Sequence, residues 1–390
     1  MDQKKIIDSS SILIVDDNVR NLQVLGGFLK NEGIEAEFAI DGISAFDWLG
    51  KKKFDLILLD VMMPGIDGFE VCSKIKNNPA YQDISVIFIT AKADTDSIIK
   101  GFKAGAVDYI TKPFIKSELL ARVKTHLNII NSKQIIIHYL KKINSSIEYA
   151  RNIQDAVLNT SEVNTENLPK YFIFNRPKDI LSGDFCWINK IDAQAIFAVM
   201  DCTGHGVPGA LMSILGTTLL NETITQENVL LPDKILESLR KKLIRSLGQN
   251  QVIISVKDGI EGSIVNYNLE SGVLLYAGTL NPIIHISDNK MNEIKADRIP
   301  IGFYEKQVNF SLKTINIKKG DIIYLFTDGY FDQFGGPDTK KIMSKRFSEL
   351  LFKNHNLPLR SQKKKLIDYL KWWQKDEEQT DDILIVGIQF

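Results

Sequence analysis

The sequence has few cysteines, no excess of charge of either sign and no long apolar run. Its three cysteines (Cys72, Cys186 and Cys202) stand singly with no CxxC spacing, so we expect no disulfide framework and a reducing cytoplasm. Lys and Arg (48) balance Asp and Glu (48), which leaves no basic field for nucleic acid or an anionic membrane surface. No apolar run approaches the roughly 18 residues of a membrane span. The N-terminal residues MDQKKIIDSS also lack the apolar stretch of a signal peptide.

Several catalytic motifs are missing as well. The chain contains no GxSxG, no GxxxxGK[ST] and no HExxH, which disfavours a serine hydrolase, a P-loop nucleotidase and a zincin. No helix-turn-helix pattern or basic patch follows the N-terminal region, so a DNA-binding regulator is also disfavoured.

At 390 residues the chain is too long for one hydrophobic core, and its 44% hydrophobic and 25% charged residues are ordinary for globular proteins. Changes in texture along the chain predict three parts. These are a first domain over 1–124, a helical connector over 125–165 and a second domain over 166–390.

Short Val/Ile/Leu runs alternate with amphipathic stretches between residues 11 and 124. The apolar runs are SILIV, IEAEFAI, FDLILL, ISVIFIT and VDYI. Five such alternations predict an α/β doubly wound five-stranded parallel sheet covered by helices on both faces. Ligands bind such sheets at the carboxyl ends of the strands, where Asp16, Asp17, Asp60 and Thr90 fall.

These polar residues suit phosphate chemistry. Adjacent Asp16 and Asp17 are typical of a site for Mg²⁺, which prefers hard oxygen ligands. The carboxylate of Asp60 can accept a phosphoryl group covalently. Lys112 offers a point charge for the phosphate and Thr90 a hydroxyl donor.

Residues 11–124 resemble the receiver domain of two-component response regulators. The resemblance rests on DD, LLDVMMPGIDGFE, FITA and KAGAVDYITKPF. It implies a cognate histidine kinase, with Asp60 as the phosphoacceptor. It further implies that Mg²⁺ is held by Asp16, Asp17, Asp60 and the backbone carbonyl of Met62. Thr90 and Lys112 would contact the phosphoryl group, with Tyr109 at the aromatic switch position. A receiver retained only for docking is the alternative.

The segment 116–158 has no Pro or Gly and reads as one helix. A narrow apolar seam with 4-3 spacing, typical of coiled coils, is broken by Lys133 and Gln154. The seam consists of Ile129, Ile136, Leu140, Ile143, Ile147, Ala150 and Val157. It predicts a dimer-forming or signalling helix; an amphipathic helix packed on its own domain is the alternative.

From about 168 onward the chain is mostly strands, interrupted by helices near 208–226, 232–247 and 340–374. Strands with segregated helices predict an α+β layered sandwich. Asp184, Asp201, Asp328 and Asp381-Asp382 lie beside these strands and are flanked by glycines that let backbone and ligand approach. Several carboxylates of this kind are what a pair of metal ions acting on phosphate requires.

The second half resembles the SpoIIE-type branch of the metal-dependent serine/threonine phosphatases of the 2C class, which implies an α-β-β-α sandwich. The matching pieces are RPKDILSGDFCWI, DCTGHGVPGALMS, LFTDGYFDQFGG and TDDILIV. The resemblance implies two Mn²⁺ or Mg²⁺ ions. Their ligands would be Asp184, Asp201, Asp328, Asp381 (or Asp382) and the backbone carbonyl of Cys202.

The ending DDIL departs from the commoner DD-x-T, which leaves the choice between Asp381 and Asp382 open. His205 is either an acid that protonates the leaving serine or, as we favour, a hydrogen-bonded turn residue near the site.

Together these features predict a response regulator whose output is a protein phosphatase. Asp201 and Asp328 would take part in hydrolysing phosphoserine or phosphothreonine through a water activated by two metal ions. The resemblance suggests a STAS-type anti-sigma-factor antagonist as substrate. The alternative is a catalytically weak binding module that sequesters a partner under receiver control.

Overall fold

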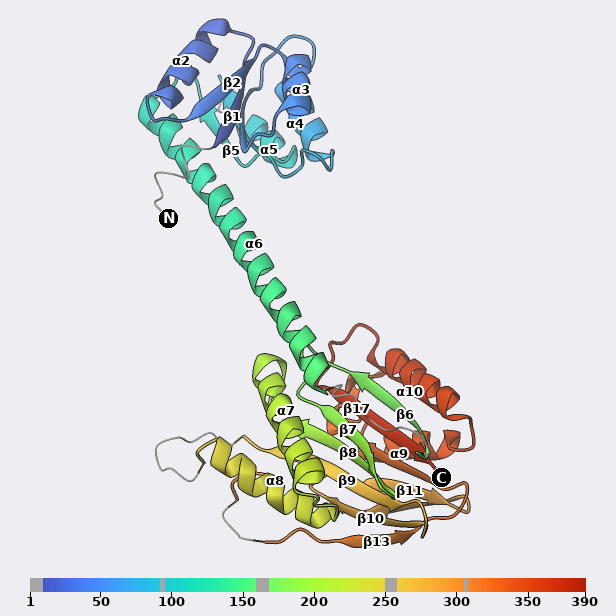
Figure 1. Cartoon of the computed structure of the whole chain (residues 1–390). Helices are drawn as coiled ribbons and strands as arrows, with labels where there is room; N and C mark the ends of the chain where they lie inside the picture. The colour runs from blue at the N-terminus through green and yellow to red at the C-terminus, as the bar shows by residue number, and fades with distance from the viewer. Residues whose placement is uncertain (1–9, 92–94, 159–167, 250–257, 305–307) are drawn as a thin grey trace. The chain divides into compact units, whose positions relative to one another are not determined.

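The computed structural model describes residues 10–91, 95–158, 168–249, 258–304 and 308–390 (Figure 1). The chain forms two compact units, Met1–Ile143 and Asn144–Phe390, and each is described by itself below.

The first unit is built on a five-stranded parallel sheet with the order β2-β1-β3-β4-β5. Its strands are β1 Ser11–Val15, β2 Glu35–Ala39, β3 Leu56–Asp60, β4 Ser85–Thr90 and β5 Asp108–Thr111. Its helices are α2 Val19–Lys30, α3 Gly42–Lys51, α4 Gly68–Lys76, α5 Thr95–Lys103 and the first part of α6 Lys116–Leu158. This confirms the predicted doubly wound architecture.

Both faces of this sheet are buried, which explains the nearly continuous apolar strand sequences. Side chains of α2 and α6 pack against one face, and side chains of α3 and α4 pack against the other. Polar caps fix where the helices begin: Asn18 caps α2, Asp67 caps α4, and Asp41 with Ser44 forms a capping box on α3. Helix α2 therefore starts just after the end of β1 that carries Asp16 and Asp17, and α4 starts eight residues after Asp60.

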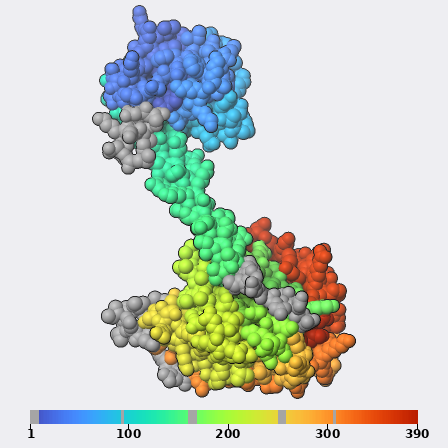
Figure 2. All heavy atoms as spheres, viewed as in Figure 1, coloured from blue at the N-terminus to red at the C-terminus, as the bar shows by residue number. Residues whose placement is uncertain are grey.

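Helix α6 runs without interruption over Lys116–Leu158, as predicted. Its first turns are buried in the first unit through Leu119, Val123 and Leu127. The middle of the helix, from Ile135 to Ile143, is exposed, and its side chains lie at the surface in Figure 2. The residues after Ile143 belong to the second unit.

The second unit contains two five-stranded antiparallel sheets, ordered β13-β10-β9-β8-β7 and β12-β11-β14-β17-β6. The strands of the first sheet are β7 Phe185–Ile191, β8 Gln194–Cys202, β9 Ile260–Asn268, β10 Val273–Gly278 and β13 Lys313–Asn316. Those of the second are β6 Lys170–Arg176, β11 Ile283–Ser287, β12 Lys290–Ile294, β14 Ile322–Phe326 and β17 Ile383–Gln389. A small hairpin joins β15 Phe334–Gly335 to β16 Lys340–Lys341.

Helices cover the outer faces of both sheets, which gives the predicted α-β-β-α sandwich (Figure 1). The helical elements are α7 Gly206–Asn221, η1 Glu222–Gln226, α8 Pro232–Ser246, η2 Asp328–Tyr330, α9 Ser344–Asn354 and α10 Leu359–Gln374. One apolar core lies between the sheets, where Phe197 and Val265 meet Leu325 and Val386. A second core lies under α7 and α8, and a third under α9 and α10.

Local details differ from the sequence expectation. The expected helix 208–226 ends as α-helix at Asn221 and continues as one π-helical turn, η1. Strand β13 is short, because only Lys313–Asn316 pairs with β10. Strand β12, with its exposed KMNEI sequence, was not predicted because it lacks an alternating apolar face.

Within the described parts of the chain, no helix is both long enough and apolar enough to cross a membrane.

Candidate functional sites

The carboxyl ends of β1 and β3 bring the acidic residues of the first unit together. Asp16 and Asp17 follow β1, and Asp60 is the last residue of β3. Ligand oxygens from these three residues lie within 4.8 Å of one another. Asp16 and Asp60 are buried, at 0% and 3% exposed, whereas Asp17 is exposed. The arrangement presents one open side of an acidic cluster to solvent.

Lys112, which follows β5, connects the two buried carboxylates. Its Nζ donates to Asp16 Oδ2 (2.9 Å) and to Asp60 Oδ2 (2.8 Å). Burial raises the pKa of Asp60, and the hydrogen bond from Lys112 opposes that rise. The amide of Met62, two residues beyond Asp60, donates to Asp60 Oδ1 (3.4 Å). The two buried carboxylates are thus paired with the Lys112 ammonium, and their remaining oxygens with those of Asp17 are the hard ligands that a divalent cation could bind.

Asn21, on the first turn of α2, is a site residue that the sequence reasoning missed. Its Nδ2 donates to both carboxylate oxygens of Asp16, at 2.9 and 3.0 Å. This contact fixes the orientation of the buried carboxylate. The sequence could have identified Asn21 from its position one helical turn beyond the cap residue Asn18, which places it on the side of α2 that faces the end of β1.

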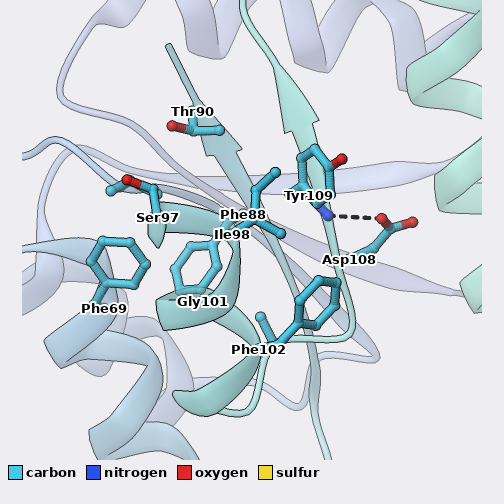
Figure 3. A pocket seen from close by; sticks show the side chains of 11 residues that line it. Phe69, Phe88, Thr90, Ser97, Ile98, Gly101, Phe102, Asp108 and Tyr109 are labelled. Atoms are coloured by element: carbon cyan, nitrogen blue, oxygen red, sulfur yellow. Dashed lines mark hydrogen bonds between the residues drawn. The ribbon is translucent and has the colours of Figure 1, made fainter. Parts of the chain in front are cut away.

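Thr90 ends β4 and Tyr109 lies in β5, and both line a small pocket of about 20 Å³ that Figure 3 shows from close by. Phe69, Phe88 and Phe102 form its apolar walls. The Arg122 guanidinium lies over the Tyr109 ring, 5.5 Å from its centroid, and donates to Asp108 at 2.7 Å. The pocket lining therefore runs from Val61, next to Asp60, to Asp108, which accepts the hydrogen bond from Arg122 of α6.

In the second unit both sheets contribute carboxylates to one place. Asp184 immediately precedes β7 and Asp201 lies in β8, both of the first sheet. Asp328 begins η2 just after β14, and Asp381 precedes β17, both of the second sheet. The sequence separates these residues by up to 197 positions, yet the sandwich brings them together.

Mutual repulsion shows how closely these carboxylates interact. Burial first, and then Asp184, Asp328 and Asp381, raises the pKa of Asp201 to about 10. Burial, together with Asp332 and Asp381, raises the pKa of Asp328 to about 6. Burial also holds the pKa of Asp184 well above its usual range. Such a cluster favours bound protons or a bound cation.

The neighbours Asp381 and Asp382 have different surroundings. Both oxygens of buried Asp382 accept backbone hydrogen bonds, from Lys178 N at 2.7 Å and from Gly183 N at 2.6 Å. Asp381 is exposed, and its Oδ1 accepts from the Asp382 amide at 2.8 Å. Asp382 therefore holds the loop that contains Asp184, while Asp381 faces outward beside the cluster.

Glycine is required where this loop approaches the strand end. A Cβ on Gly183 would lie 2.7 Å from the carbonyl oxygen of Gly204 and 3.2 Å from that of Cys202. The Cys202 carbonyl thus lies close to the backbone just before Asp184. The Cys202 side chain itself is buried, and burial raises the pKa of its thiol.

Two further polar residues at this site were not identified from the sequence. Thr327 Oγ1 donates to Asp184 Oδ2 at 2.6 Å. Glu261 in β9 pairs with Asp201 across the sheet, and burial followed by the Asp328 charge raises its pKa. Thr327 directly precedes Asp328 in the motif LFTDG, so the sequence could have identified it as a site residue. Glu261 was not, because only strand pairing places it beside Asp201.

His205 lies at the N-terminal cap position of α7, with its ring half exposed. Its Nδ1 is 2.7 Å from Asp179 Oδ2. This is the hydrogen-bonded turn residue that the sequence favoured.

The donor sets of both units fit divalent cations that prefer oxygen. Buried carboxylates that repel one another would be stabilised by a cation between them, and hard oxygen ligands are those of Mg²⁺ and Mn²⁺. Among the residues that the structure describes, only Asp16, Asp17 and Asp60 place three ligand atoms within 4.8 Å.

Family comparisons agree with this geometry. Residues 192–390 match the family described as stage II sporulation protein E (SpoIIE), which is more than half of the chain. The chain belongs to the SpoIIE family. Residues 12–124 match the response regulator receiver domain. The protein is therefore a receiver domain joined to a SpoIIE domain.

A solved structure, the SiaA-PP2C domain of Pseudomonas aeruginosa, resembles the SpoIIE part of the chain. It is 27% identical with a TM-score of 0.59, and the match covers 65% of this chain and 98% of that one. This similarity supports the assignment of the SpoIIE unit to a PP2C-type phosphatase family.

Curated relatives match the receiver. The response regulator PleD of Caulobacter vibrioides is 43% identical over 117 residues, which is 30% of this chain and 26% of that protein. The regulatory protein VanRc of Enterococcus gallinarum is 40% identical over 119 residues, 30% of this chain and 50% of that protein. The chain spans between 26% and 64% of the length of the curated relatives it matches first.

Proposed function

We propose that this protein is a phosphorylation-regulated protein serine/threonine phosphatase, a response regulator whose output is hydrolysis of a phosphoprotein. The observation that carries the proposal is the carboxylate cluster of the SpoIIE domain, in which Asp184 is buried, Asp201 and Asp328 are partly buried and Asp381 is exposed. Its acids come from both sheets, and burial first, then the charges of neighbouring carboxylates, raises the pKa of Asp201 and Asp328. Perturbed acids gathered in one place are typical of a functional site.

In this proposal Asp184, Asp201, Asp328 and Asp381 hold two divalent cations, together with the Cys202 carbonyl. When bound, Mn²⁺ or Mg²⁺ supplies a water activated for attack on the phosphorus of phosphoserine or phosphothreonine. We assign Asp381 rather than Asp382 as the ligand because both oxygens of Asp382 are occupied by backbone donors.

The remaining residues of the site orient the ligands. Thr327 fixes one oxygen of Asp184 through its hydroxyl group. Asp382 holds the Gly183 amide and with it the loop that leads to Asp184. Residues that orient metal ligands in this way tune the affinity of a site for its ion.

The receiver would accept a phosphoryl group on Asp60 from a cognate histidine kinase. Asp16, Asp17, Asp60 and the Met62 carbonyl would hold Mg²⁺, which neutralises the incoming phosphate. Lys112, already bonded to Asp60, would contact the phosphoryl oxygens together with Thr90. Tyr109, at the aromatic switch position, would change its side-chain conformation on phosphorylation and so alter the surface of β5.

The partners follow from the same proposal. The substrate would be a phosphoprotein, and the family resemblance favours an anti-sigma-factor antagonist of the STAS type. The exposed seam residues Ile129, Ile136, Leu140 and Ile143 of α6 would pair with a second copy of the chain. Phosphorylation would act on the SpoIIE domain through this helix.

The direct test is release of phosphate from phosphorylated STAS-type proteins in the presence of Mn²⁺. We expect release by the wild type and a loss of at least about 100-fold in Asp201→Asn, because one acidic metal ligand would be removed. Glu270→Gln, on an exposed turn, is a matched control that should keep full activity. Full activity of Asp201→Asn would contradict the mechanism. Tight binding of the phosphoprotein without any release would instead favour a binding module.

A further inference from the structure

Gln154 is a buried polar residue on a largely exposed helix. It lies near the C-terminal end of α6 and is 3% exposed, whereas its neighbours Ile153 and Asp155 are exposed. In the apolar seam of α6 it replaces a hydrophobic residue. Burying a primary amide is unfavourable unless its donors and acceptor are satisfied.

The amide of Gln154 is satisfied by two residues of the second unit, to which the end of α6 also belongs. Its Nε2 donates to the Ser182 carbonyl (2.6 Å) and to Ser213 Oγ (2.8 Å). Its Oε1 accepts from the Ser182 amide at 3.3 Å. Both backbone groups of Ser182 are thus bonded to one side chain of α6.

Ser182 in turn connects to the candidate metal ligand Asp184. The Ser182 hydroxyl accepts from the Asp184 amide at 3.1 Å and lies 3.0 Å from the Asp184 carbonyl oxygen. Ser213 lies on α7, the helix that follows the DCTGHG loop. A rotation or shift of the end of α6 would therefore break bonds to the Asp184 loop and to α7 at the same time.

We propose that Gln154 is a positioning residue that couples the end of α6 to the metal centre. Its amide sets the place of the Ser182–Asp184 loop against α7, so that a movement of α6 changes the affinity of the site for its ions. The claim that α6 controls activity rests on the proposed phosphatase function. The claim that Gln154 positions the ion site concerns ion binding alone and does not depend on that function.

The test uses the full-length protein with Gln154→Met, which keeps the length and volume of the side chain and removes its hydrogen bonds. Mn²⁺ binding to the metal-free protein is measured by titration calorimetry. We expect affinity about tenfold weaker than that of the wild type, the lower end of the effect of residues that orient metal ligands. Hydrogen exchange of the amides in residues 182–184 should become faster. Gln134→Met, a matched change at an exposed position of the same helix, should alter neither quantity.

A second readout is the ratio of phosphate release with and without beryllofluoride, which mimics phosphorylation of Asp60. This ratio should approach one in Gln154→Met and keep the wild-type value in Gln134→Met. A Gln154→Met protein with lower thermal stability but unchanged Mn²⁺ affinity and ratio would overturn the proposal, since Gln154 would then only stabilise the fold.

Two outcomes are kept apart by this design. If the wild type releases no phosphate, the proposed function fails, while calorimetry still decides whether Gln154 positions the ion site. If Gln154→Met does not fold, Ser213→Ala removes one acceptor of the Gln154 amide and is measured in the same way. A several-fold loss of Mn²⁺ affinity in Ser213→Ala supports the role of Gln154, and unchanged affinity refutes it.

Discussion

At the scale of single residues, identical side chains take different roles because of their surroundings. Asp381 and Asp382 are neighbours in the sequence, yet one is exposed beside a carboxylate cluster and the other is buried with two backbone donors. The motif TDDIL does not distinguish them. Alternation along a strand predicts on which face each side chain lies, but not which hydrogen-bond donors surround it.

Substitution of Asp382 should lower the stability of the fold, whereas substitution of Asp381 should lower the affinity for Mn²⁺. Asp382→Asn replaces one accepting oxygen by an NH2 group that faces the amide of Lys178 or of Gly183, so we expect a loss of about 1–3 kcal/mol in the free energy of unfolding. Asp381→Asn should not destabilise the metal-free protein, because it removes a charge that repels Asp201 and Asp328, and it should weaken Mn²⁺ binding. Thermal unfolding in EDTA and titration calorimetry measure the two effects. Equal destabilisation by both variants would contradict the assignment of Asp381 as the ligand.

The acid cluster also predicts how pH affects the metal-free protein. The pKa of Asp328 is raised to about 6 and that of Asp201 to about 10 in the folded state, both from 3.8. The folded chain therefore binds more protons than the unfolded chain above pH 4, so its stability falls as pH rises through this range.

We expect the unfolding temperature in EDTA to be higher at pH 5.5 than at pH 8. Calorimetric scans should show a shift of about 2–4 °C for each kcal/mol lost. Mn²⁺ should reduce or reverse the fall, since the ion competes with the protons. Asp328→Asn should also reduce it. Stability that rises with pH in EDTA would show that these acids are not coupled in the folded protein.

At the scale of elements, α6 combines two environments along one apolar seam. Ile129, Ile136, Leu140 and Ile143 are exposed, whereas Ile147 is partly covered and Gln154 is buried in the second unit. The interpretation of a helix packed on its own domain therefore holds for the end of α6, and dimerisation through its exposed part stays a prediction. The 4-3 spacing predicted the helix and its apolar side, but periodicity cannot say whether a partner helix or the chain's own domain covers that side.

Two charges in the exposed part of the seam should prevent self-association. Ile136→Glu with Leu140→Glu changes only exposed positions, so the fold should remain intact while the mass measured by light scattering falls from dimer to monomer. Gln134→Glu with Ser145→Glu adds the same charge to exposed polar positions outside the seam and should leave the dimer intact. A wild-type protein that is monomeric at micromolar concentration would contradict dimerisation through α6.

At the scale of the whole molecule, the chain joins a receiver to a SpoIIE domain through a helix that begins in one unit and ends in the other. Neither domain alone requires the other for its core, since each has its own sheets and its own buried clusters. Each unit therefore has a core of its own, and α6 is the segment of the described chain that belongs to both.

Beryllofluoride should change phosphate release by the full-length protein. The reason is that phosphorylation of Asp60 alters the contact of Lys112 with Asp60 and the surface of β5, from which α6 follows. Asp60→Ala should remove the response and keep the basal rate, because Asp60 is far from the SpoIIE site in sequence and belongs to the other unit. Steady-state release assays with both proteins measure the effect, and an equal response in Asp60→Ala would refute control through the receiver.

The sequence by itself determined the two folds, the family resemblances and the residue types of both sites. Strand periodicity and local motifs such as LLDVMMPG and SGDF depend on neighbours in the chain, so they can be recognised without a structure. Only the tertiary structure decided which of Asp381 and Asp382 is held by the backbone, that Asn21 orients Asp16 and that Glu261 faces Asp201. It alone also showed that Gln154, a break in the seam, bonds to the loop before Asp184. The reason is physical: these contacts join residues brought together by sheet pairing and helix packing, which no local pattern records.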